Sequence, residues 1–235
     1  MSRTTALKPR RVQHAMSAAA LMATFLLTAC AQSAPFSFYT LVGPVATQPA
    51  AARTPLLIEV LPSTVPTQVQ RPQLVLTTAP GQIKIMEQQR WSQPVADEIS
   101  QALSQDLTRR LPAVDVYRSA HSDAQAVYRV ALNVQRFESV PGNRATLDAV
   151  WSVTVNPRGL VMTCHSIMNQ PVAAGLAGTD PDYAALVDAH RQAIQQLSGE
   201  IASAIGQLAA LPPGSTHAGT SAASPNPGLA CPGTP

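Results

Sequence analysis

Charged and aromatic residues are scarce in this chain. Asp, Glu, Lys and Arg together make up 12% of the 235 residues, and Phe, Trp and Tyr make up only 4%. A long coiled coil needs rows of charged side chains beside its apolar seam, and an acidic disordered protein needs a high net charge. The composition excludes both classes, and the 21 prolines argue further against long uninterrupted helices.

The basic charge lies largely at one end of the chain. Four of the 16 Lys and Arg residues fall within the first eleven positions, whereas the first of the 13 acidic residues is Glu59. Cleavage before Cys30 would leave 12 basic and 13 acidic residues, a net charge of −1. The formal charge of +3 therefore belongs to the N-terminal segment, and we expect no nucleic-acid partner.

The first 29 residues are predicted to be a lipoprotein signal peptide. Basic residues come before the apolar run Met16–Ala29, which is shorter than the roughly 20 residues of a membrane-spanning helix. The run ends in Leu27-Thr28-Ala29-Cys30, which resembles the lipobox of bacterial lipoproteins. We therefore expect Cys30 to carry covalent lipid, rather than to end a transmembrane helix. Two or three long acyl chains hold a protein firmly on a bilayer.

The residue after Cys30 is Ala31. The site resembles that of enterobacterial lipoproteins, in which Asp at the position after the Cys retains the protein in the inner membrane. Its absence predicts a location on the periplasmic face of the outer membrane. No second run of 18 apolar residues follows that could span a bilayer.

Composition divides the rest of the chain into three parts. Residues 30–54 are rich in Ala, Pro, Gln and Thr and are expected to be a tether, interrupted only by a short predicted strand at Phe36–Leu41. Residues 55–210 are long enough to bury a core of their own. Residues 211–235 are rich in Pro, Gly, Ser, Thr and Ala and are predicted to be a disordered tail that is dispensable for folding.

Hydrophobic periodicity within residues 55–210 predicts an α+β fold. Apolar residues recur at helical spacing from Val95 to Leu111 and again from Tyr183 to Leu208, and Ser92 and the Asp180-Pro181-Asp182 turn are expected to begin these helices. Period-two segments predict strands, at 55–61, 73–77, 82–88, 114–117, 128–135, 145–155 and 160–168. We expect a two-layer sandwich in which two amphipathic helices pack on a mostly antiparallel sheet.

The sequence contains no motif for catalysis or metal binding. The nucleophile elbow G-x-S-x-G, H-E-x-x-H, paired C-x-x-C, the P-loop and the dinucleotide glycine fingerprint are all missing. Cys164 and His165 are neighbours on a predicted strand, so their side chains point to opposite faces and cannot form a nucleophile–base pair. We expect no enzymatic activity, no metal and no cofactor other than the lipid on Cys30.

Other titratable residues fit structural roles better than chemical ones. Asp97 and Glu98 lie in the first turn of a predicted helix, where negative charge is stabilised by the helix dipole. His190 falls on the apolar stripe of the second predicted helix and is interpreted as a core histidine. The periplasm permits a disulfide between Cys164 and Cys231. We favour Cys164 as an unpaired core residue instead, because Cys231 lies in the predicted tail.

Two motifs in the predicted domain carry a resemblance to a known family. Arg71-Pro72-Gln73-Leu74-Val75 leads into a strand, and Arg90-Trp91-Ser92-Gln93-Pro94 joins a strand to a helix. Together with the lipobox, Tyr39-Thr40-Leu41 and Leu57-Ile58-Glu59-Val60, they resemble the PqiC (YmbA) family. The resemblance covers roughly Phe38–Leu208, although Ser63–Val69 lacks the Tyr-Leu pair usual there. Members of that family are auxiliary lipoproteins of ABC-type and MCE-type intermembrane transport systems.

The resemblance implies a non-catalytic subunit that binds a periplasmic MCE-type protein and an inner-membrane permease system, with a homo-oligomer left open. An outer-membrane assembly lipoprotein of the LptE kind is the alternative, and a periplasmic hydrolase is a third. Arg90 and Trp91 are the candidate partner contact, since Trp and Arg are enriched at interface hot spots. An ion pair for Arg90 and a core position for Trp91 are the competing interpretations, and we favour them.

Overall fold

The structure is a computed structural model that describes residues 35–44, 55–174, 181–212, 219–220 and 230–233. The predicted signal peptide and Cys30 lie outside these residues. From Phe36 onward the chain forms one compact unit. The short strand expected within the tether pairs with the strand that ends at Trp91, so this segment is part of the fold.

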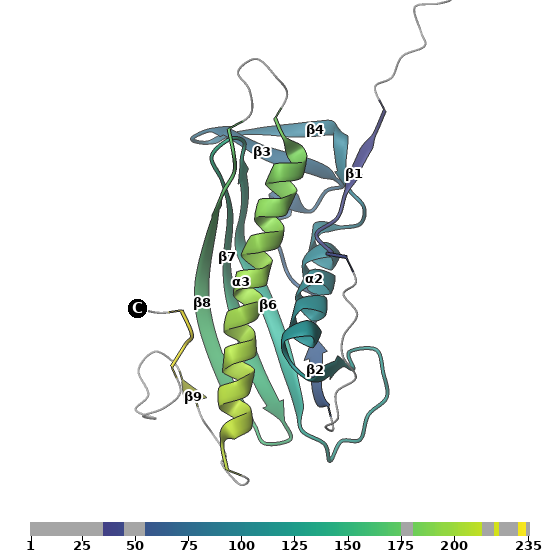
Figure 1. The fold of residues 1–235 in the computed structure, drawn as a ribbon, viewed down its shortest axis with the longest axis vertical. Coiled ribbons are helices and arrows are strands. Elements are labelled where there is room, and N and C mark those ends of the chain that lie inside the picture. Colours follow the sequence, from purple (N-terminus) through teal and green to yellow (C-terminus); the bar gives the residue numbers. More distant parts are fainter. Residues whose placement is uncertain (1–34, 45–54, 175–180, 213–218, 221–229, 234–235) are drawn as a thin grey trace, which may run out of the picture. The chain divides into compact units, whose positions relative to one another are not determined.

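Two helices and two sheets make up the α+β fold that the sequence predicts (Figure 1). The small sheet has the strand order β1-β4-β3, and the large sheet has the order β5-β2-β6-β7-β8-β9. The elements are β1 (Ser37–Tyr39), β2 (Leu56–Val60), the 3-10 turn η2 (Thr67–Val69), β3 (Gln73–Ala79), β4 (Gln82–Trp91), α2 (Val95–Arg110), β5 (Ala113–Asp115), β6 (Val127–Val140), β7 (Arg144–Asn156), β8 (Leu160–Pro171), α3 (Tyr183–Ala210) and β9 (Gly219–Thr220).

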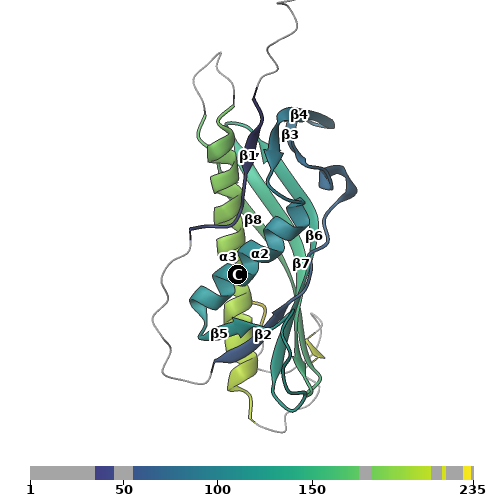
Figure 2. The same cartoon turned by 90° about the vertical axis from the view of Figure 1, so that its right-hand side faces the viewer.

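The large sheet is built around the antiparallel meander β6–β7–β8, which confirms the sequence prediction. Alternation of side chains decides its two faces: along β8 every second residue from Leu160 is buried and the residues between are exposed. Both helices cover the same face of this sheet (Figures 1 and 2). α3 packs on β7 and β8, and α2 lies beside it against β2 and β5.

The small sheet consists of the β3–β4 hairpin and β1. Pro80-Gly81 was predicted to turn this hairpin, and Gly81 indeed has a φ of 74°, a conformation that glycine adopts without steric cost. β1 adds to the other side of β4 in parallel, with Phe38 opposite Arg90 and Tyr39 opposite Trp91. The single sheet expected from the sequence is therefore two sheets, because β4 pairs only with β1 and β3.

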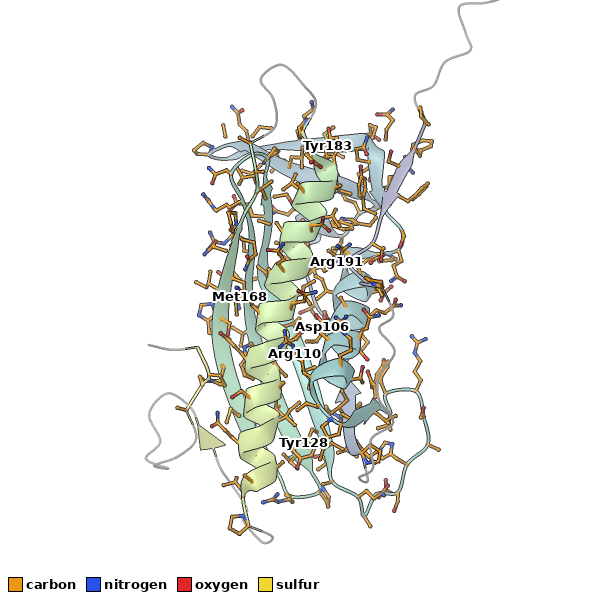
Figure 3. The ribbon with its side chains drawn as sticks, viewed as in Figure 1. Asp106, Arg110, Tyr128, Met168, Tyr183 and Arg191 are labelled. Carbon is orange, nitrogen blue, oxygen red and sulfur yellow. A yellow bond between two sulfur atoms is a disulfide. The ribbon has the colours of Figure 1, made fainter. Side chains whose placement is uncertain are left out.

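The helix termini follow the predicted positions with one exception. The side chain of Asp182 accepts a hydrogen bond from the Ala185 N–H at 2.9 Å and so caps α3. Ser92 does not cap α2, whose N-cap position is Pro94; its hydroxyl donates instead to the Glu98 carboxylate. Arg110, in the last turn of α2, donates to the Gln195 carbonyl oxygen at 2.8 Å and so links the two helices (Figure 3).

Cys164 and Cys231 form a disulfide. The interpretation of Cys164 as an unpaired core residue is therefore wrong, although its side chain is buried on the inner face of β8. The described parts of the C-terminal tail also have contacts: β9 pairs with Val161 and Met162, and Gly233 lies against the Glu200 side chain of α3. Backbone pairing and a covalent bond need no hydrophobic period, so the sequence pattern did not reveal them.

His190 of α3 is a core histidine, as predicted, and its ring is 1% exposed. It stacks on Phe137 of β6 with the ring centroids 3.9 Å apart. Its Nε2 and the Ser139 hydroxyl are hydrogen-bonded at 2.8 Å, whereas Nδ1 has no hydrogen-bond partner among the described residues. Burial lowers the pKa of His190 from 6.5 to about 3.

The disulfide gives the first testable prediction. Cys231→Ser is expected to lower the free energy of unfolding by about 2–4 kcal/mol, because the bond closes a long loop in the unfolded chain. Urea unfolding of the two proteins with and without reductant measures this. Reductant should destabilise the wild type and leave Cys231→Ser unchanged. Equal stability of the oxidised wild type and the variant would contradict the prediction, and would restore the expectation of a dispensable tail.

The buried histidine predicts a pH dependence of stability. His190 is neutral in the folded state below pH 6.5 but takes up a proton when the chain unfolds, so stability is complete above pH 6.5 and falls as the pH drops toward 3. The slope should approach about 1.4 kcal/mol per pH unit. Thermal unfolding of the wild type and His190→Phe between pH 6.5 and 4.5 measures it, and the variant should lack this slope.

The carboxylate of Asp148, on the outer face of the large sheet, adds no pH dependence of stability between pH 6.5 and 4.5. Burial raises the pKa of Asp148, but hydrogen bonds from His165 and Arg136 outweigh burial and hold it below 3.8. Its contribution to stability is therefore present above pH 3.8 and is lost only below that value. Parallel pH profiles for the wild type and His190→Phe would show that His190 is not the source of the dependence.

Candidate functional site

The predicted contact pair Arg90–Trp91 ends β4, and its two side chains point to opposite faces of the small sheet. Trp91 is 6% exposed and packs edge-on against Phe137, with the ring centroids 6.1 Å apart. Its backbone N–H donates to the Pro72 carbonyl oxygen at 2.7 Å. The indole therefore fills the core, which is the competing interpretation that we favoured, and of the pair only Arg90 remains on the surface as a candidate contact.

Arg90 lies on the outer side of the small sheet. Its Nε donates to the Glu87 carbonyl oxygen at 3.0 Å, and its guanidinium lies 4.4 Å from the centroid of the Phe36 ring. No acidic side chain forms an ion pair with Arg90 among the described residues. The expected ion pair is therefore replaced by a cation–π contact with the N-terminal segment.

Phe36 and Phe38 are the residues that sequence reasoning missed. They are 52% and 65% exposed, although burial of a Phe side chain is worth roughly 1.5–3 kcal/mol. The alternation of Phe36 and Phe38 with Ser37 and Tyr39 was a usable signal. In a strand it places the two Phe rings on one side and Tyr39 on the other. We call the surface formed by Phe36, Phe38, Ile83 and Arg90 the small-sheet face.

The N-terminal segment, Phe36–Pro44, is bound to the fold mainly through one carboxylate. Glu98, in the first turn of α2, is 0% exposed. Its Oε2 accepts hydrogen bonds from the Thr40 hydroxyl at 2.7 Å and from the Leu41 N–H at 2.8 Å, and its Oε1 accepts from the Ser92 hydroxyl. Three donors thus satisfy a buried charge that would otherwise be costly.

Further contacts hold the same segment from both helices. The Arg191 guanidinium of α3 donates to the Thr40 carbonyl oxygen at 3.0 Å. The Gln105 side chain of α2 donates to the Gly43 carbonyl oxygen and accepts from the Gly43 N–H, each at 3.1 Å. The Tyr39 ring lies 6.5 Å from that of Tyr183. Figure 3 shows Tyr183 and Arg191 on the part of α3 that lies toward β1.

A polar hollow of about 660 Å³ lies along the exposed side of α2. Its walls come from α2, the end of β2 and the segment after β5, and they include Ser100, Ser104 and Asp115. The Ser104 hydroxyl donates to the Asp115 carboxylate, and the Ser100 hydroxyl donates to the Ala96 carbonyl oxygen at 2.8 Å. Both hydroxyls are therefore already engaged as hydrogen-bond donors. No histidine lines the hollow to act as a base toward a serine.

The remaining candidates for chemistry are kept apart by the fold. Cys164 is bonded to Cys231 on the inner face of β8, and His165 faces outward to Asp148 at 2.7 Å. Within the described residues no group of three or more His, Cys, Asp or Glu side chains could hold a metal ion. No helix in the same part of the chain is long and apolar enough to cross a membrane.

Comparison with known proteins places these features in a family context. The family model described as "ABC-type transport auxiliary lipoprotein component" matches residues 39–202. No curated protein matches the chain. The crystal structure of an uncharacterised protein is similar at 20% identity and a TM-score of 0.56, covering 73% of this chain and 99% of that one. A DUF330 protein from Xanthomonas campestris is 22% identical, with a TM-score of 0.49 and coverage of 70% and 92%.

The buried carboxylate predicts a sharp difference between two neighbouring acids. Glu98→Ala is expected to lower the free energy of unfolding by about 2–4 kcal/mol, because it leaves buried donors without an acceptor. Asp97→Ala is the matched control: it removes an exposed acid from the same helical turn and should cost well under about 1 kcal/mol. Urea unfolding of both variants measures these free energies. Similar losses of stability in the two variants would show that the hydrogen bonds of Glu98 do not stabilise the fold.

Proposed function

The chain belongs to the family of ABC-type transport auxiliary lipoprotein components, and on that basis we propose that it is a non-catalytic subunit anchored by lipid on Cys30. We place the lipid in the outer membrane, so that the folded part faces the periplasm. There it binds a periplasmic MCE-type protein and, through that protein, an inner-membrane permease system. It needs no cofactor or metal for this role.

The observation that carries the proposal is how the N-terminal segment is held. Phe36, where the compact unit begins, is six residues after Cys30 in the sequence. Glu98, Gln105 and Arg191 bind the next few residues to α2 and α3. A domain whose first strand is fixed this firmly next to its acylation site is well suited to stay at a membrane surface.

The disulfide supports a location outside the cytoplasm. Bonds such as Cys164–Cys231 form and persist in oxidising compartments, and the bacterial periplasm is one of them. The polar hollow supports binding rather than turnover, because the Ser100 and Ser104 hydroxyls already donate to the Ala96 carbonyl oxygen and to the Asp115 carboxylate, and no histidine lines the hollow. A subunit that contributes only binding needs no more chemistry than this.

The test uses the full chain expressed in a bacterium that carries the neighbouring transport genes. Cys30→Ser should leave an unprocessed precursor in the inner membrane, because the acylated thiol is lost. Cys231→Ser is the matched control: it also removes a thiol but should be processed and fractionate with the outer membrane. Normal processing and outer-membrane fractionation of Cys30→Ser would end the anchoring proposal.

The partner is tested by gentle detergent extraction of the wild type and identification of the proteins that purify with it. MCE-type and permease components are the expected result. Recovery of outer-membrane assembly proteins instead would favour an assembly lipoprotein of the LptE kind over the transport subunit.

A further inference from the structure

The small-sheet face carries three exposed apolar side chains, two of which are close in the sequence to the predicted anchor at Cys30. Among the described residues seven large apolar or aromatic side chains are exposed, and three of them, Phe36, Phe38 and Ile83, belong to this face. Ile83 is 50% exposed. A concentration of this kind marks a surface that another apolar phase or molecule covers.

Strand pairing shows that these side chains share one side of the small sheet. Phe38 lies opposite Arg90, and Arg90 lies opposite Gln73 of β3. Val75 and Thr77 lie two and four residues after Gln73 on β3 and therefore point to the same side. Val75 pairs with Ile85 and Thr77 pairs with Ile83, so both isoleucines are on that side as well. Residues directly opposite in a sheet point to the same face, and so do alternate residues of one strand.

The other side of the small sheet is already occupied. Leu74 and Leu76 of β3 and Trp91 of β4 point that way and are buried against the rest of the fold. On the outer side Phe36, Phe38 and Ile83 remain at least half exposed within the described part of the chain. Figures 1 and 2 show the small sheet at the same end of the large sheet as the start of α3.

The predicted anchor restricts what can cover this face. Phe36 is six residues after Cys30, and an extended chain spans at most about 3.6 Å per residue, or about 22 Å in all. With the acyl chains of Cys30 in a bilayer, Phe36 cannot move farther than this from the membrane surface. The lipid headgroup layer is therefore always within reach of the exposed rings.

We propose that the small-sheet face lies on the lipid bilayer, with the Phe36 and Phe38 rings in the headgroup region. This inference rests on the proposed lipidation of Cys30. Aromatic side chains concentrate at the membrane interface, and buried apolar area there adds to the binding of an anchor. Arg90, stacked on Phe36, brings a cation to the level of the lipid phosphates.

The charge of the face predicts which lipids it needs. Glu87 is close to Arg90 on β4 and accepts a hydrogen bond from the Gln73 side chain at 3.3 Å. One acidic and one basic group leave the face near neutrality. Contact with the bilayer should therefore not require anionic lipid, and vesicles of pure phosphatidylcholine are a sufficient probe.

The experiment places an environment-sensitive fluorophore on the full acylated chain. Phe38→Cys introduces a thiol at an exposed position, while Cys30 is acylated and Cys164 is bonded to Cys231. Ile167→Cys is the matched control, because Ile167 is 49% exposed and lies on the outer side of β8, in the large sheet. Both proteins are labelled in detergent and reconstituted in phosphatidylcholine vesicles, and emission and quenching by lipid-borne nitroxides are measured.

The label at position 38 should shift to shorter wavelength on reconstitution and be quenched by nitroxide lipid, whereas the label at position 167 should do neither. An acylated protein whose label at position 38 stays in water overturns the inference and leaves the proposed function intact. A mass spectrum without lipid on Cys30 overturns both.

A protein partner on the same face, the role first expected for Arg90, is the competing outcome. Phe38→Ser separates the two, since it removes an exposed ring without disturbing the core. Retention of the transport partner by this variant, in detergent extracts, supports a bilayer contact. Loss of the partner from a variant with unchanged thermal unfolding overturns it and assigns the face to protein binding.

Discussion

The buried carboxylate of Glu98 is the interaction on which the arrangement of this fold depends. It brings together the N-terminal segment, the end of β4 and the first turn of α2, through Leu41, Ser92 and its own helix. A charge in the interior is tolerated only where donors surround it, so these three pieces of chain must meet in one geometry. β1 is then placed on the outer edge of β4, and Phe36 and Phe38 are presented to the outside.

Most of the fold could be predicted from the sequence because apolar residues recur at regular spacing along its strands and helices. The meander β6–β7–β8 alternates apolar and polar residues over more than ten positions per strand, and α3 carries one apolar stripe throughout. The division into two sheets could not be predicted, since alternation within a strand does not say which neighbour it pairs with. The short strand at Phe36–Leu41 was predicted, but not its pairing with β4, because six alternating residues do not indicate which strand they pair with.

The candidate site was predicted in part. Arg90 does lie on an outer surface, but the adjacent Trp91 had to point inward, because neighbouring residues in a strand face opposite sides. The exposed rings of Phe36 and Phe38 were a stronger signal than the Arg-Trp pair. They lie in a segment that was expected to be a tether, so no site was predicted there. The disulfide depended on tertiary proximity of Cys164 and Cys231, which no local pattern encodes.

That disulfide also changes how the protein responds to cutting. Cys164 and Cys231, with the whole of α3 between them in sequence, enclose a ring of chain. A protease that cleaves one peptide bond within the ring leaves a single covalent molecule, whose pieces separate only under reducing conditions. A single nick within this ring would therefore detach neither α3 nor the C-terminus from the sheet, and the fold would survive damage that divides an unbridged protein in two.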